Sequence, residues 1–280
     1  MFVLRKIYCR AFQLAFRAAL PFLPYRNPEI ISSDAEIPAV LRKHELQKVM
    51  IVTDAGIRKL GLTSFLEKTL AEEGIGYCIY DRTVANPTIW NVEEAKDLYL
   101  KEGAQALIAF GGGSSMDCAK AAGARIVKPR QSIRQMKGLL KVHKKLPLLI
   151  AIPTTAGTGS ETTLAAVITD SEKHYKYPIN DFSLIPRYAV LDYHETVGLP
   201  KSITATTGMD ALTHAVEAYI GGSTTRETRK MAEKAVYLVH QYLKRAYDNG
   251  HDKEARKGML KAAYYAGVAF TKSYVGYVHA

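Results

Sequence analysis

Short apolar runs alternate with longer stretches of helical periodicity between residues 47 and 170. The apolar runs have the length and composition of buried strands. They are Lys48–Thr53, Gly76–Tyr80, Ala106–Phe110, Leu148–Ile152 and Ala165–Thr169. The longer stretches repeat apolar residues every three or four positions and predict helices over Ile57–Glu72, over Thr88–Lys101 and from Ser114 onward. Strands and helices that alternate in this way predict βαβ units around a mostly parallel sheet.

The pattern changes near residue 200. Lys201–Ile220, Thr225–Tyr247 and Asp252–Phe270 read as three helices, and no strand pattern separates them. We therefore expect an α/β domain over residues 29–195 followed by an all-α domain over residues 196–280.

A separate pattern precedes both domains, over residues 1–28. Apolar residues recur there at helical spacing, with arginines mostly between them. Pro21 and Pro24 would end this basic amphipathic helix. Such a helix can dock on its own protein or on a partner subunit, lie on a membrane surface, or serve in targeting. We favour docking and keep membrane-surface contact as the alternative.

The composition is that of an ordinary globular protein, with 48% apolar and 23% charged residues. It argues against a disordered or fibrous chain, and no apolar run has the roughly 18 residues of a membrane-spanning helix. The three cysteines form no CxxC pair. A sparse, odd set favours a reducing compartment, and we expect a cytoplasmic protein.

The net charge of +11 is concentrated in two blocks, residues 1–25 and residues 128–145. The second block holds seven Lys or Arg residues and no acid. It lacks the interleaved aromatic residues of single-strand binders, so we interpret it as a solvated face and expect no nucleic-acid partner.

Two loops that follow predicted strands have the composition of phosphate sites. Gly111-Gly112-Gly113 comes directly after Ala106–Phe110, and a helix begins just beyond it. Glycines let the backbone approach a diphosphate, and a helix N-terminus offers free amides, although a plain tight turn would have the same sequence. Pro153–Glu161 (PTTAGTGSE) concentrates hydroxyls and glycines after the next buried strand. Because carboxyl ends of parallel strands share one edge, the two loops reinforce each other.

Two acidic positions carry open interpretations. Asp54 ends the first strand, where an acid either hydrogen-bonds a ribose or caps the next helix. Asp210 and His214 stand four residues apart, so on a helix they share one face and can hold a metal ion. The apolar residues around Asp210 make a buried carboxylate costly unless it is paired or metal-bound.

The motifs GGGSSMDCAK, PTTAGTGSE and GMDALTHAVEAY occur in this order, and together the sequence resembles the iron-containing (group III, metal-dependent) alcohol dehydrogenases. The stretch DRTVANPT and the ending AGVAFTKSYVGYVHA also resemble that family. The resemblance runs from about residue 30 to the last residue. Glycerol dehydrogenases and dehydroquinate synthase-like lyases share the implied fold but differ around the cofactor loops.

The resemblance implies a dinucleotide-binding α/β domain, a helical metal-binding domain of dehydroquinate synthase-like type, and NAD as the cofactor, with NADP less favoured. It places Fe²⁺, or Zn²⁺ as the alternative, on Asp210, His214 and His279, and it gives no catalytic residue beyond these ligands. The implied cofactor-binding residues come from both loops and three further positions. They are Asp54, Asn86, Gly112, Gly113, Ser114, Ser115, Asp117, Thr154, Thr155, Thr158 and Lys176.

The implied activity is the interconversion of an alcohol and an aldehyde or ketone, in which the metal acts as a Lewis acid and hydride passes to nicotinamide. A homo-oligomer and a small-molecule substrate are further expectations. In the family, the histidine matching His279 is followed by two more, the last a metal ligand, whereas this sequence stops at Ala280. We therefore expect an incomplete helical domain and low activity. The alternative is a non-catalytic nucleotide-binding remnant or an oligomer partner.

Overall fold

The computed structural model describes residues 2–273, 276, 278 and 279. The chain divides into two compact units. The α/β unit comprises Asn27–Thr155 and Ser160–Gly198, and the helical unit comprises Met1–Arg26, Ala156–Gly159 and Leu199–Ala280. No helix among the described residues is both long enough and apolar enough to cross a membrane.

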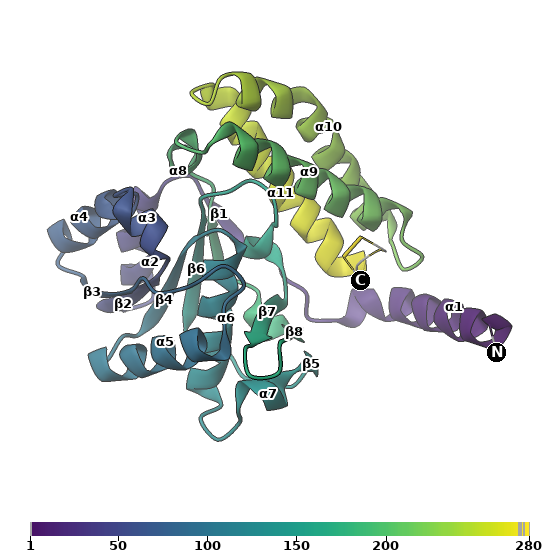
Figure 1. Ribbon diagram of the computed structural model, residues 1–280, viewed down its shortest axis with the longest axis horizontal. Coiled ribbons are helices and arrows are strands. Elements are labelled where there is room, and N and C mark those ends of the chain that lie inside the picture. Colours follow the sequence, from purple (N-terminus) through teal and green to yellow (C-terminus); the bar gives the residue numbers. More distant parts are fainter. Residues whose placement is uncertain (1, 274–275, 277, 280) are drawn as a thin grey trace. The chain divides into compact units, whose positions relative to one another are not determined.

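A six-stranded parallel sheet forms the centre of the α/β unit, in the order β1-β9-β6-β4-β2-β3 (Figure 1). Its strands are β1 (Glu29–Ile31), β2 (Lys48–Val52), β3 (Gly76–Tyr80), β4 (Ala106–Gly111), β6 (Leu148–Pro153) and β9 (Tyr188–Val190). The pairing of Val49 with Ala106 and of Ala106 with Leu148 sets the register of the three central strands. All six carboxyl ends therefore lie at one edge.

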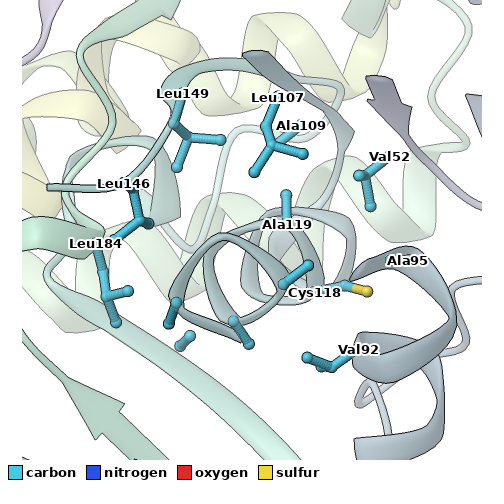
Figure 2. Close-up of a cluster of buried hydrophobic side chains, with 14 of the residues drawn as sticks. Val52, Val92, Ala95, Leu107, Ala109, Cys118, Ala119, Leu146, Leu149 and Leu184 are labelled. Atoms are coloured by element: carbon cyan, nitrogen blue, oxygen red, sulfur yellow. The ribbon is translucent and has the colours of Figure 1, made fainter. Parts of the chain in front are cut away.

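Alternating residues of the central strands send side chains to opposite faces of the sheet. Met50 and Val52 pack in one apolar cluster, whereas Val49 and Ile51 pack in the other. Figure 2 shows part of the first cluster, in which Val52 and Leu107 of the sheet face Val92 and Cys118 of two helices. Sheet residues buried on both faces explain the nearly continuous apolar runs in the sequence.

The helices of the α/β unit cover both faces. The first cluster includes side chains of α5 (Ile89–Glu102), α6 (Gly113–Val127) and α7 (Ile133–Met136). The second includes side chains of α2 (Ile37–Lys43), α3 (Ala55–Lys59) and α4 (Ser64–Glu72). The α/β class predicted from the sequence is thus confirmed.

The strand predicted over Ala165–Thr169 belongs to a smaller sheet of three strands. Its order is β5-β8-β7, with β5 (Gly138–Leu139), β8 (Tyr175–Asn180) and β7 (Ala165–Asp170). Strands β7 and β8 are antiparallel. The unit also contains η2 (Asp34–Glu36), η3 (Ser160–Thr162), η4 (Phe182–Leu184) and α8 (His194–Val197).

The single helix predicted over Ile57–Glu72 is wrong, because α3 ends at Lys59 and α4 begins at Ser64. Gly61 has a φ of 70°, and its N–H donates to the carbonyl of Arg58, while the N–H of Leu62 donates to that of Ile57. These two bonds form a Schellman motif, which ends a helix at a left-handed glycine. The apolar periodicity continues across the break because α3 and α4 both pack in the second cluster.

The helical unit contains three long helices, α9 (Lys201–Ile220), α10 (Arg226–Asp248) and α11 (Lys253–Ser273). Thr225 caps α10 by accepting a hydrogen bond from the N–H of Thr228. The same unit contains α1 (Phe2–Ala19) and η1 (Leu20–Phe22). An all-α C-terminal region is therefore confirmed as well.

Candidate nucleotide and metal sites

The glycine-rich turn at the end of β4 leads directly into α6. Gly111 has a φ of 147°, and a Cβ at this position would lie 2.6 Å from the Ser115 Oγ. Gly112 is the N-cap of α6, and no side chain among the described residues caps the first turn there. This 15-residue helix thus begins with N–H groups that no N-cap side chain satisfies, next to glycines whose backbone a ligand can approach closely. This geometry is suited to an anion such as a diphosphate.

The second loop lies beside the first. The N–H of Thr154 donates to the carbonyl of Gly111 at 3.1 Å, and a Cβ on Gly112 would lie 3.5 Å from the Thr155 Oγ1. Thr154 and Thr155 therefore join Gly112, Gly113, Ser114 and Ser115 at the carboxyl edge of the sheet.

Thr158 belongs to the helical unit, as part of Ala156–Gly159, whereas the other predicted cofactor residues belong to the α/β unit. A Cβ on Gly157 would lie 2.8 Å from the carbonyl oxygen of Thr207, and one on Gly159 would lie 2.7 Å from that of Ala263. The glycines of this loop are thus required for its close packing on α9 and α11.

Asn86 and Lys176 meet at the start of α6. Asn86 has a φ of 56°, and its N–H donates to the Ser114 Oγ at 3.2 Å. The Lys176 Nζ donates to the Asn86 Oδ1 at 2.7 Å, although the two residues are 90 positions apart. Three predicted cofactor residues are therefore brought together, with an exposed cation beside the uncapped helix turn.

Asp54 and Asp117 already have partners within the protein. Asp54 Oδ1 accepts a hydrogen bond from the N–H of Ile57 and caps α3. The two carboxylate oxygens of Asp117 accept from the Ser160 Oγ and from the N–H of Val167. Burial raises the pKa of Asp117. Asp54 keeps both of its sequence-based interpretations, whereas the bonds of Asp117 show a role in holding neighbouring segments together.

Lys120 is a buried cation that sequence reasoning missed. Its Nζ lies within 3.0 Å of five oxygens, which belong to Ser160, Thr163 and Ala165. Burial lowers the pKa of Lys120 to about 8, and the nearby charges of Asp117 and Glu161 oppose that shift. Lys120 lies three residues after Asp117, on the same side of α6, and this spacing is the signal that could have found it.

The three predicted metal ligands come together in the helical unit. Their ligand atoms all lie within 4.8 Å of one another. The Asp210 Oδ1 lies 3.9 Å from the His214 Nε2 and 3.3 Å from the His279 Nε2. Ligands about 2.1 Å from a tetrahedral ion are separated by roughly 3.4 Å, so this donor set fits a divalent metal.

The environment of His214 favours a neutral, metal-binding ring. The ring centroids of His214 and His279 are 4.3 Å apart, and Phe270 packs 4.4 Å from the ring of His214. Burial lowers the pKa of His214, although the charge of Asp210 opposes the shift. A metal ion requires the unprotonated imidazole.

Glu217 is a second residue that sequence reasoning missed. Its Oε2 lies 2.7 Å from the His279 Nδ1, and its Oε1 accepts from the N–H of Val278 at 2.7 Å. Burial acts to raise the pKa of Glu217, but these hydrogen bonds outweigh it and lower the pKa. Asp210, His214 and Glu217 follow one face of α9 at intervals of four and three residues, which was the available signal.

Matches to known protein families extend over nearly the whole chain. A model described as iron-containing alcohol dehydrogenase matches residues 29–193, and one described as the C-terminal part of the Fe-containing alcohol dehydrogenase family matches residues 204–280. The chain is 42% identical to alcohol dehydrogenase 4 of Schizosaccharomyces pombe over 246 residues, which cover 88% of this chain and 58% of that protein.

Two further similarities agree with these matches. The chain is 40% identical to the NAD-dependent methanol dehydrogenase of Bacillus methanolicus, covering 87% of this chain and 64% of that protein. An alcohol dehydrogenase structure from Oenococcus oeni superposes with a TM-score of 0.87 at 35% identity, covering 91% of this chain and 68% of the other. The chain thus spans about three fifths of the length of the two curated relatives. Both family models, together with the folds and motifs described above, show that the chain belongs to the iron-containing alcohol dehydrogenase family.

Proposed function

We propose that this protein interconverts an alcohol and an aldehyde or ketone, with NAD(H) as hydride carrier and a divalent metal, Fe²⁺ before Zn²⁺, on the helical unit. The observation that carries the proposal is the convergence of Asp210, His214 and His279 at metal-ligand distances. The name of the methanol dehydrogenase relative supports NAD as the cofactor.

Each set of residues has a distinct task in this reaction. The amides of Gly113 and Ser114 would hold the diphosphate, and the ammonium of Lys176 would neutralise part of its charge. Asp210, His214 and His279 would hold the ion, and Lewis acidity toward the substrate oxygen is what the ion supplies when bound. Glu217 would keep the Nε2 of His279 unprotonated and correctly directed.

The experiment is a fluorescence titration of the purified 280-residue chain with NADH, with and without Fe²⁺ or Zn²⁺, followed by assay of NAD⁺ reduction with small primary alcohols. We expect saturable NADH binding and weak, metal-dependent turnover. Asp210→Asn should abolish turnover and leave NADH affinity unchanged, because Asp210 is not a predicted cofactor residue. Absence of NADH binding would contradict the proposal.

A second candidate is a nucleotide-binding protein without catalysis. It is favoured by the observation that the glycine-rich turn before α6 suits a diphosphate by itself, without any contribution from the metal site. NADH binding without any metal-dependent turnover would support this candidate. The three free cysteines agree with a reducing compartment, and we propose the cytoplasm as the site of either function.

Asp54 offers a test of the cofactor choice that keeps the fold intact. Asparagine at this position would still cap α3, but it would remove the negative charge. We expect Asp54→Asn to raise the affinity for NADPH about tenfold relative to NADH, because the repulsion of a 2′-phosphate is lost. Parallel titrations with both cofactors measure this ratio. An unchanged ratio would leave Asp54 only its capping role.

A further inference from the structure

Helix α1 presents apolar side chains to solvent. Ile7, Tyr8 and Leu14 are 60%, 70% and 64% exposed, and Phe22 just beyond the helix is 88% exposed. Ile7 and Leu14 are two turns apart and therefore share one face of the helix. Several exposed apolar residues on one short segment indicate a surface that meets a partner.

Two polar side chains of α1, Arg10 and Gln13, lie against the protein's own chain. Arg10 donates a hydrogen bond to the Gln13 Oε1 at 3.2 Å. A Cβ at Gly222 would lie 2.3 Å from that oxygen and 3.0 Å from the Arg10 Nη1, so both side chains lie against the backbone there. An amphipathic helix that docks on its own domain does the reverse and buries its apolar face. Ile7, Tyr8 and Leu14 thus stay available to a partner, while Arg10 and Gln13 lie against the protein's own chain.

The charge of the segment selects among the possible partners. Residues 2–22 contain Arg5, Lys6, Arg10 and Arg17 and no acidic residue. A second copy of the helix would bring like charges together, and a nucleic acid would neutralise them while leaving the apolar face in water. An anionic lipid surface satisfies both features, because headgroups pair with arginine while apolar side chains enter the acyl boundary.

We propose that α1 is a docking surface for anionic phospholipid bilayers, which holds this protein on a membrane surface. The helix lies on the bilayer and does not cross it, because α1 contains four basic residues and is too polar to span. Arg17 lies three residues after Leu14 and borders the apolar face, where its stem can extend toward the headgroups, and Arg10 adds positive charge one helical turn after Ile7.

The test is flotation of the full-length protein with vesicles of phosphatidylcholine alone or with about a third of the lipid as phosphatidylglycerol. We expect binding to the anionic vesicles and at least about tenfold weaker binding to the neutral ones. Ile7→Ser with Leu14→Ser should reduce binding to anionic vesicles by about tenfold or more. Arg10→Gln with Arg17→Gln should lower it and reduce its sensitivity to salt.

The matched control is Leu60→Ser with Phe65→Ser, which removes two exposed apolar side chains of the α/β unit. Unchanged binding of this variant, with an unchanged circular dichroism spectrum of both pairs, would support the proposal. Equal binding to neutral and anionic vesicles, or equal loss in the control, would overturn it. Sedimentation as a dimer that Ile7→Ser with Leu14→Ser dissociates, without vesicle binding, would assign the surface to a second copy instead.

Discussion

At the scale of single residues, Glu217 connects the backbone after α11 to the ring of His279. Its side chain is nearly buried, and both of its oxygens are occupied. A carboxylate behind a metal-binding histidine fixes the ring and raises its basicity. Glu217 is therefore a positioning residue for the proposed metal site. Its substitution should change the metal affinity directly and the turnover only as a consequence.

We expect Glu217→Gln to weaken Co²⁺ binding by about 10- to 100-fold, because the amide cannot accept from both the backbone and the imidazole as a carboxylate does. Titration of the visible Co²⁺ absorption measures the affinity without any turnover. Glu233→Gln, on an exposed position of α10, is the control and should leave the affinity unchanged. Equal Co²⁺ affinity in both variants would remove Glu217 from this role.

Glu195 is a buried carboxyl group whose ionisation should affect stability. Burial, and then the charges of Asp34 and Asp192, raise its pKa from 4.5 to about 8. Between these two values the folded protein holds a proton that the unfolded chain releases. The stabilisation is therefore complete below about pH 4.5 and is lost as the pH rises toward 8.

Glu195→Gln should match the wild-type free energy of unfolding near pH 4 and exceed it by about 3 to 5 kcal/mol near pH 8.5, because the neutral amide has no proton to lose. Urea unfolding at the two pH values measures both differences. Glu72→Gln, at an exposed position of α4, should show no such pH dependence. A constant difference across the pH range would mean that Glu195 ionises normally in the folded state.

At the scale of elements, Lys120 fastens α6 to the segment that enters β7. Five oxygens of residues 160–165 surround its ammonium group, and the side chain is completely buried. Removing the cation would leave several buried acceptors without a donor, which costs more than the loss of the hydrogen bonds alone.

We expect Lys120→Met to lower the free energy of unfolding by about 3 kcal/mol or more. Chemical denaturation followed by circular dichroism provides the measurement. Lys101→Met, on the exposed side of α5, should cost little. Equal stability of the two variants would show that water replaces the lysine without loss.

The elements that the sequence predicts well are those with a strong, local pattern. Strands β2, β3, β4 and β6 are buried on both faces or flanked by glycine, so their apolar runs are continuous. By contrast, β8 alternates exposed and buried positions and contains a proline, and β1 and β9 have only three residues each. Their pairing depends on distant strands, which no local pattern reveals.

The same difference applies to the sites. The four-residue spacing of Asp210 and His214 indicates a shared helix face directly. Lys176 meets Asn86 across 90 residues, and Glu217 meets His279 across 62, so only the tertiary fold brings them together. The family resemblance gave Asn86, Lys176 and His279, whereas Glu217 and Lys120 needed the structure.

At the scale of the whole molecule, the two proposed ligands should stabilise different parts of the chain. A ligand that binds only the folded state slows hydrogen exchange where opening would release it. NADH should protect the amides around Gly111–Ser115, and Zn²⁺ should protect α9 around Asp210 and His214. Hydrogen exchange followed by mass spectrometry resolves the two sets.

Asp210→Asn provides the control for this experiment, because it should abolish protection by Zn²⁺ and preserve protection by NADH. Protection by Zn²⁺ that persists in this variant, or that falls on the α/β unit alone, would place the metal elsewhere.

The loop Ala156–Gly159 gives the protein a connectivity that two successive domains would not have. These four residues lie in the middle of the α/β sequence, yet they pack among the helices through Gly157 and Gly159. Cleavage after Gly198 would therefore leave the loop on the N-terminal piece. On the C-terminal piece it would expose the surfaces of α9 and α11 against which the loop packs. We therefore expect that neither half folds by itself. A chimera that replaced the helical half from residue 199 onward would also have to replace this tetrapeptide.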